Sequence, residues 1–153
     1  MPEDTPQVLS LDQKRAAYAW ECVSAARNIL GKDYEKFVPL VKSAPALIMN
    51  NGLMQFLAFC RSKLDDKNPN KEMRYRLLLL AMLTWLADEE RALAIVRSAS
   101  DIPLDSQKKL YQRIMGFLSQ SASSSYRLKS QEALELAKWL KQHADAMKSL
   151  VTS

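Results

Sequence analysis

Few residues of this chain have the chemistry for catalysis, and they lie far apart. His143 is the single histidine, and Cys22 and Cys60 are the two cysteines. A serine or cysteine nucleophile activated by histidine would have to use His143. No glycine-rich turn accompanies it, so the sequence favours a boundary or surface histidine. A zinc site needs three or four histidine or cysteine ligands. We therefore expect no catalytic residue, no metal site, no cofactor and no small-molecule substrate.

An acidic run, Asp88-Glu89-Glu90, is the other group that could do chemistry. Adjacent carboxylates can be imagined around a metal ion. Negative side chains also stabilise the N-terminus of a helix, where the backbone dipole is positive. We favour this second interpretation, which predicts a helix beginning at the acidic run.

The composition indicates which fold must position these residues. The 153 residues include only three glycines, whereas 48% are hydrophobic. β-Sandwiches, barrels and phosphate-binding loops depend on glycine for turns with positive φ. The sequence therefore predicts an all-α fold, a single compact bundle of about six helices over residues 10–153. A flexible lead-in is expected over residues 1–9, which contain two prolines.

The sequence also indicates a compartment. No run approaches 18 uncharged apolar residues, so we expect no membrane partner. The first eleven residues carry Glu3 and Asp4 but no basic residue, unlike a secretory signal. We expect a cytoplasmic protein with free, buried thiols at Cys22 and Cys60. A disulfide between them is the less favoured alternative.

Apolar residues at the helical period predict the elements, and glycine and proline predict where they end. The first helix should run from Ser10 or Asp12 to Leu30 and stop at Gly31. A short helix should follow over residues 34–42. The next should open at Pro45 and continue through the Asn50-Asn51-Gly52 step. Further helices are expected over residues 72–86, 88–98, 106–118 and 130–150, with polar connections at 65–71 and 119–125.

Positive charge is concentrated in the last third of the chain. The net charge is +5, and residues 105–153 hold eight basic and four acidic side chains. On the last predicted helix, Lys138, Lys141 and Lys148 share one flank of the apolar stripe. Such a basic stripe can track a phosphate backbone, although a solvated helix face explains the same pattern. Trp139 lies on the opposite flank, a position that allows contact with a partner.

Several local patterns, taken in order, resemble one protein family. The most specific is the block Pro45-Ala46-Leu47-Ile48-Met49-Asn50-Asn51-Gly52-Leu53-Met54-Gln55. Gln13-Lys14-Arg15-Ala16 precedes it, and Tyr126-Arg127-Leu128 and Trp139-Leu140-Lys141 follow. Together they resemble the small subunit family of the type III-B CRISPR–Cas effector, the Cmr complex, over about residues 11–147. Residues 88–120 match little of the family's pattern.

The resemblance implies an all-α subunit without catalytic activity. It also implies that the Asn51-Gly52 step lies within a helix. The implied partners are the backbone subunits of the Cmr complex, further copies of this chain, the guide RNA and the target RNA. Copies would stack along the ribonucleoprotein filament in antiviral defence. Guide pairing would supply specificity, so the protein would need only shape and charge.

The predicted nucleic-acid contacts combine the family blocks with the clustering of charge. Lys14 and Arg15 open the first helix, where the dipole disfavours cations. Arg15 and Arg127 can equally be structural, tying helix ends together. The predicted set is Lys14, Arg15, Arg127, Lys129, Lys138 and Lys141. The alternative function is a helical protein–protein adaptor without nucleic-acid contact.

Overall fold

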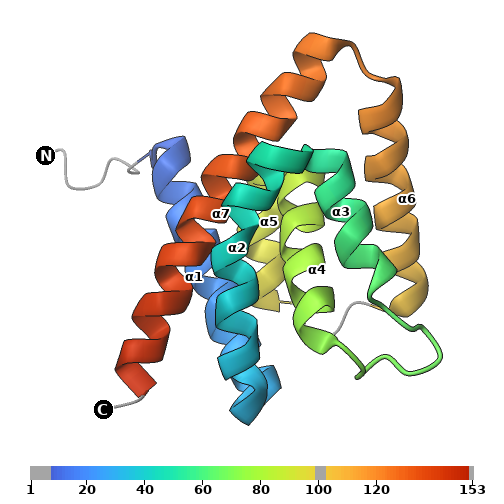
Figure 1. Cartoon of the computed structure of the whole chain (residues 1–153). Coiled ribbons are helices and arrows are strands. Elements are labelled where there is room, and N and C mark those ends of the chain that lie inside the picture. Colours follow the sequence, from blue (N-terminus) through green and yellow to red (C-terminus); the bar gives the residue numbers. More distant parts are fainter. Residues whose placement is uncertain (1–7, 99–102, 152–153) are drawn as a thin grey trace, which may run out of the picture.

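A computed structural model describes residues 8–98 and 103–151, and its regular elements are all helical (Figure 1). The predicted all-α bundle is confirmed. The predicted lead-in over residues 1–9 falls mostly outside the described residues. The elements are α1 (Leu11–Leu30), η2 (Gly31–Asp33), α2 (Tyr34–Asn51), α3 (Leu53–Ser62), α4 (Met73–Ala87), α5 (Glu89–Ser98), α6 (Leu104–Gln120) and α7 (Ser123–Val151).

α1 begins and ends where the sequence predicts. The Ser10 hydroxyl accepts a hydrogen bond from the Gln13 backbone N–H at 3.1 Å, and the Gln13 side chain accepts one from the Ser10 N–H at 2.8 Å. This reciprocal capping box satisfies two backbone donors at the helix start. At the other end Gly31 has a φ of 55°, a value that glycine adopts without a side-chain penalty.

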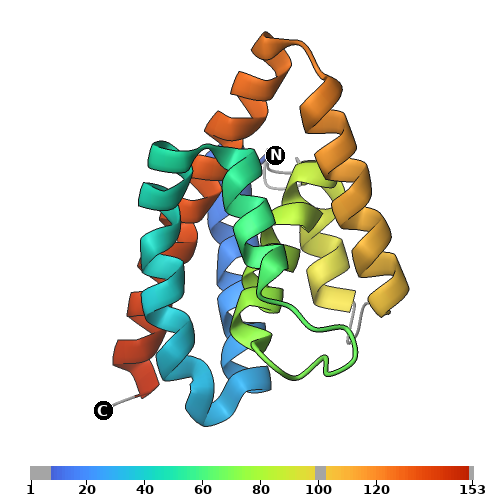
Figure 2. The ribbon, with the colours of Figure 1, turned by 45° about the vertical axis from the view of Figure 1, so that its right-hand side comes forward.

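The boundary between α2 and α3 corrects two predictions. α2 does not end at Lys42 but continues through Pro39 and Pro45 to Asn51. The chain breaks instead at Gly52, whose φ of 89° and ψ of 159° suit only glycine. The Asn51-Gly52 step is thus a junction between two helices rather than part of one. Figure 2 shows the ribbon changing direction between α2 and α3.

Packing explains why α2 runs past its prolines. Proline removes a backbone hydrogen bond inside a helix and disfavours that position locally. The buried face of α2 nevertheless lies along α7. The Tyr34 hydroxyl donates to the Ala144 carbonyl of α7 at 2.9 Å, near the start of α2. Burial on this face continues beyond both prolines. Its buried members include Val38, Val41, Ala44 and Ile48.

α4 is the central helix, as its apolar composition predicts. It packs against α1, α2, α3, α5, α6 and α7. Trp85 and Leu78 have no exposed surface. Each of the seven described α-helices contributes to one continuous core around α4, and this core fixes the relative position of every candidate side chain.

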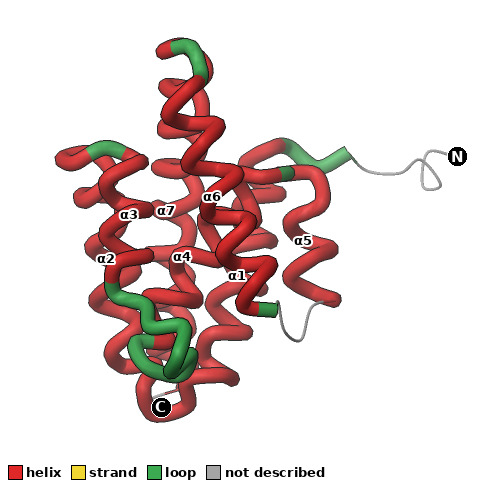
Figure 3. The backbone as a smooth tube through the Cα atoms, turned by 90° about the vertical axis from the view of Figure 1, so that its right-hand side faces the viewer, coloured by secondary structure: helices red, strands yellow, loops and turns green. Residues whose placement is uncertain are grey.

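The last helix is longer than predicted. The serine-rich residues 119–125 are expected to form a link, yet α6 extends to Gln120 and α7 begins at Ser123. Serine is well tolerated at helix starts, where it can serve as a cap. The Tyr126 hydroxyl accepts a hydrogen bond from the Met54 backbone N–H at 3.3 Å, which ties the first turn of α7 to α3. The α6–α7 connection projects beyond the other helices (Figure 3).

Both cysteines are free, as expected, but only Cys60 is buried as predicted, whereas Cys22 is partly exposed at the residue level. Cys60 is fully buried, and burial raises its pKa to about 12. Burial likewise raises the pKa of Cys22 to about 12, so both thiols stay neutral at physiological pH. Among the described residues, no helix is long and apolar enough to cross a membrane.

Candidate nucleic-acid interface

α7 carries four of the six predicted contacts, and its inner face fixes their direction. The buried stripe of α7 packs against α1 on one side and α2 on the other. A helical side chain opposite that stripe must face solvent. The stripe consists of the six residues that the helical spacing predicts: Ala133, Leu136, Ala137, Leu140, Ala144 and Met147.

Arg15 is held inside the protein. Its Nε lies 3.0 Å from both carboxylate oxygens of Glu132, and its Nη2 contacts the same carboxylate. The Trp85 Nε1–H donates to Glu132 at 3.2 Å from the core side. Only 14% of the Arg15 side chain is exposed. The hydrogen bond with Glu132 is the main reason that the pKa of Arg15 is raised, so its guanidinium stays charged. The structure thus gives Arg15 a role between α1 and α7.

Lys14 and Lys129 also make contacts between helices. The Lys14 ammonium lies 3.3 Å from the Glu90 carboxylate of α5. The Lys129 ammonium donates to the Leu86 carbonyl at 3.1 Å and to Glu89 at 3.3 Å. A cation near the last carbonyls of α4 is favourable, because that end of the helix dipole is negative. These two lysines therefore have internal partners.

Arg127 and Lys138 are exposed on the outer side of α7, and Lys141 is half-buried at the edge of the same side. Neither Arg127 nor Lys141 makes a side-chain ion pair or hydrogen bond within residues 8–98 and 103–151. Lys138 is 54% exposed, and its one ion-pair partner among the described residues is Glu135, one turn away, at 3.3 Å. Spacings of 11 and 14 residues place the three on one helix face, over roughly 20 Å at 1.5 Å per residue. A basic ridge, Arg127, Lys138 and Lys141, is the part of the predicted site that the structure leaves open to a partner.

The opposite flank of α7 faces α1. The Trp139 Nε1–H donates to Asp12 at 2.9 Å. His143 Nε2 lies 3.0 Å from the Ala16 carbonyl, and its ring sits between Trp139 and Trp20 at centroid distances of 5.3 and 5.2 Å. Burial lowers the pKa of His143, with the Ala16 hydrogen bond opposing it. The neutral ring therefore serves packing between α1 and α7, as a boundary histidine.

Comparison with known protein families bears directly on this arrangement. Residues 11–147 match the sequence profile of a family described as CRISPR-associated protein (Cas_Cmr5). The match covers nearly the whole chain.

The chain belongs to this family.

The family is the small helical subunit of the type III-B Cmr complex, and it is non-catalytic. The predicted family resemblance and the prediction of no enzymatic activity are thereby confirmed. Association with the other Cmr subunits follows from membership.

The acidic run has the capping role that the sequence favours. The Asp88 carboxylate accepts hydrogen bonds from the backbone N–H groups of Glu90 at 3.1 Å and Arg91 at 3.3 Å. Both N–H groups lie in the first turn of α5, where no preceding helical turn supplies an i−4 carbonyl. Within the described parts of the chain, no group of three histidine, cysteine or acidic side chains is placed to hold a metal ion.

One cluster has no counterpart in the sequence prediction. Arg61 of α3, Arg76 of α4 and Lys108 of α6 all reach the carboxylate of Asp66, at 2.6, 3.4 and 3.5 Å. The Arg61 hydrogen bond is the main reason that the pKa of Asp66 is lowered. Arg76 opens the most apolar helix without an evident local partner, and that is the one signal the sequence contains.

Proposed function

We propose that this subunit contacts the sugar–phosphate backbone of the guide–target RNA duplex through the basic ridge of α7. The main observation behind the proposal is that the predicted cations fall into two groups, those paired with other helices and those on the outer side of α7. Lys14, Arg15 and Lys129 are engaged between helices, whereas Arg127, Lys138 and Lys141 share an outer face. A rigid helix presenting cations at fixed spacing suits contact with phosphates, which carry no sequence information.

Copies of the subunit stack along the filament of the complex in the cytoplasm, and each presents its α7 toward the paired RNA. Specificity comes from guide pairing, and the protein recognises the shape and charge of the A-form duplex. Target cleavage belongs to other subunits. The function of this chain in antiviral defence is to hold the duplex along its length.

The test is target-RNA binding by the reconstituted Cmr complex containing Lys138→Glu and Lys141→Glu together. We expect weaker binding and a shallower dependence of affinity on salt, because two phosphate contacts are lost. The matched control is Lys109→Glu with Arg113→Glu on α6, which makes the same change in charge on exposed positions away from α7. Assembly of both variants is checked by size-exclusion chromatography.

The outcomes separate this function from an adaptor without nucleic-acid contact. If the α7 variant assembles and binds target RNA like the α6 control, the basic ridge is not an RNA contact. If the α7 variant does not join the complex, and the remaining subunits still bind RNA, the ridge lies at a protein–protein interface instead. Loss of RNA binding by an intact particle supports the proposal.

A further inference from the structure

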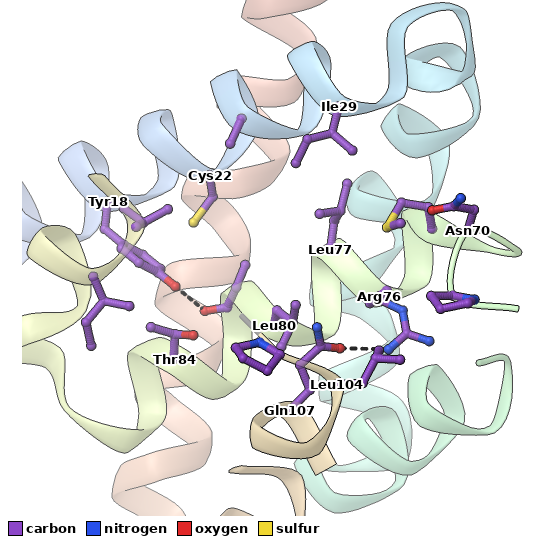
Figure 4. Close-up of a pocket in the computed structure, with 17 residues that line it drawn as sticks. Tyr18, Cys22, Ile29, Asn70, Arg76, Leu77, Leu80, Thr84, Leu104 and Gln107 are labelled. Atoms are coloured by element: carbon purple, nitrogen blue, oxygen red, sulfur yellow. Dashed lines mark hydrogen bonds between the residues drawn. The ribbon is translucent and has the colours of Figure 1, made fainter. Parts of the chain in front are cut away.

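A cleft of about 560 Å³ lies between α1, α4, α5 and α6, on a different part of the molecule from the basic ridge. Its volume falls in the range of small-ligand sites, which are mostly apolar with a few polar groups that orient the ligand. Figure 4 shows side chains from these helices converging on it. Its apolar wall includes Ile29, Leu77, Leu80, Ile95, Val96 and Leu104.

Arg76 supplies a polar group in this apolar surrounding. Only 4% of its surface is exposed. Its Nη1 donates to Gln107 at 2.7 Å, and its Nη2 lies 3.4 Å from Asp66. Its Nε is buried without a hydrogen-bond partner among the described residues. A buried donor left unpaired costs free energy, which a ligand acceptor would recover.

The charge around Arg76 is incompletely balanced. Among the described residues, Asp66 is the one carboxylate within ion-pair distance of Arg61, Arg76 and Lys108. Three cations thus share a single negative charge. No carboxylate is among the described side chains that line the cleft. An anion at this end of the cleft would therefore meet more positive than negative charge among the described residues.

The other polar side chains of the cleft are neutral and do not compete for an anion. The Tyr18 hydroxyl donates to the Ala81 carbonyl at 2.6 Å, and burial raises the pKa of Tyr18 well above its usual value. The Cys22 thiol is kept protonated by burial as well. These groups leave Arg76 as the charged anchor.

We propose that this cleft binds a small amphipathic organic anion, whose apolar part lies against Leu77 and Leu80 and whose anionic group accepts a hydrogen bond from Arg76 Nε. This site is independent of the RNA contact proposed for α7. An aliphatic carboxylate of about eight carbons is a suitable probe, because it combines an apolar chain with a single charged group.

The experiment titrates octanoate into the full-length protein and follows backbone amides by NMR. We expect saturable binding with a Kd of about 1 mM or tighter, and shifts concentrated at Leu77, Leu80 and Val96. Octan-1-ol has the same chain length without the charge, and we expect it to bind at least about tenfold more weakly. Equal binding of the two probes would overturn the role of Arg76.

Two variants test the place of binding. Arg76→Lys keeps the positive charge but loses the Nε donor. We therefore expect the affinity for octanoate to fall about tenfold and the affinity for octan-1-ol to stay unchanged. Ala25→Trp places a large side chain in the cleft from α1 and leaves the Arg76 side chain unaltered, so it should abolish binding of both probes. Ala25→Trp keeps the proposal testable if Arg76→Lys does not fold.

Lys109→Gln is the control for general loss of positive charge, because this α6 side chain is exposed and outside the cleft. It should bind octanoate like the unaltered protein. The proposal fails if no saturable binding occurs up to about 10 mM octanoate. It also fails if the shifts lie away from the cleft, or if folded Ala25→Trp binds octanoate undiminished.

Discussion

Arg15 of α1 and Glu132 of α7 form an ion pair across 117 positions of sequence, with Arg15 Nε 3.0 Å from both carboxylate oxygens. Glu132 is 8% exposed and also accepts the indole N–H of Trp85 in the core. The pair thus joins the two long helices to the central helix α4. A charge in this position must be matched, since an unpaired buried ion is strongly unfavourable.

Breaking this pair should destabilise the fold. We expect Glu132→Gln to lower the free energy of unfolding by about 3 kcal/mol, because the mostly buried Arg15 charge keeps only its 3.4 Å contact with the exposed Asp12 carboxylate. Urea denaturation followed by circular dichroism measures the change. Lys14→Met is the comparison, because its partly exposed pair with Glu90 should contribute at most about 1 kcal/mol. Equal effects of the two substitutions would contradict the structural role of Arg15.

Two glycines should respond in opposite directions to alanine. Gly52→Ala should destabilise by about 1–3 kcal/mol, because its φ of 89° is strained for any residue with a Cβ. Gly116 lies inside α6, and a methyl group added there would meet open space, so Gly116→Ala should stabilise by about 0.5–1 kcal/mol. Thermal unfolding of both variants tests this contrast. If Gly52→Ala stabilised the protein, the junction between α2 and α3 would not lie at Gly52.

His143 should make stability depend on pH. Burial lowers its pKa in the folded protein below the usual value of 6.5. The unfolded chain therefore binds a proton more readily, and stability falls as pH decreases through about 6.5 toward the folded pKa. We expect chemical denaturation to show this loss as the pH falls below about 7.5. His143→Gln should make the free energy of unfolding depend less on pH. If the pH profile of the variant is unchanged, other groups cause the dependence.

The end of the basic ridge offers a single-site test. Arg127→Ala should reduce the slope of log affinity against log salt by about one for target-RNA binding by the assembled complex. The reduction should be similar for different guide and target sequences, since a phosphate contact does not read bases. Gln131→Ala, on the same exposed stretch of α7, removes no charge and should leave the slope unchanged. A sequence-dependent effect of Arg127→Ala would argue for base contact instead.

The local features of the fold could be predicted from the sequence because their causes are local. Ser10 and Gln13 cap α1 within one helical turn, and Gly31 ends the helix by its own backbone freedom. Asp88 caps α5 through its immediate neighbours. The apolar stripe of α7 follows from helical spacing alone. The family resemblance rests on the same kind of information, because motifs are contiguous in sequence.

The tertiary structure decided which cations have internal partners. Lys14, Arg15 and Lys129 each pair with a carboxylate at least 40 positions away, so no local pattern distinguishes them from Arg127. The tertiary structure also explains why α2 continues past Pro45. Packing against α7 outweighs the local cost of a proline inside a helix. Sequence determined that this is an all-α protein with a basic final helix. Only packing, which depends on distant residues meeting, decided which side chains remain free on its surface.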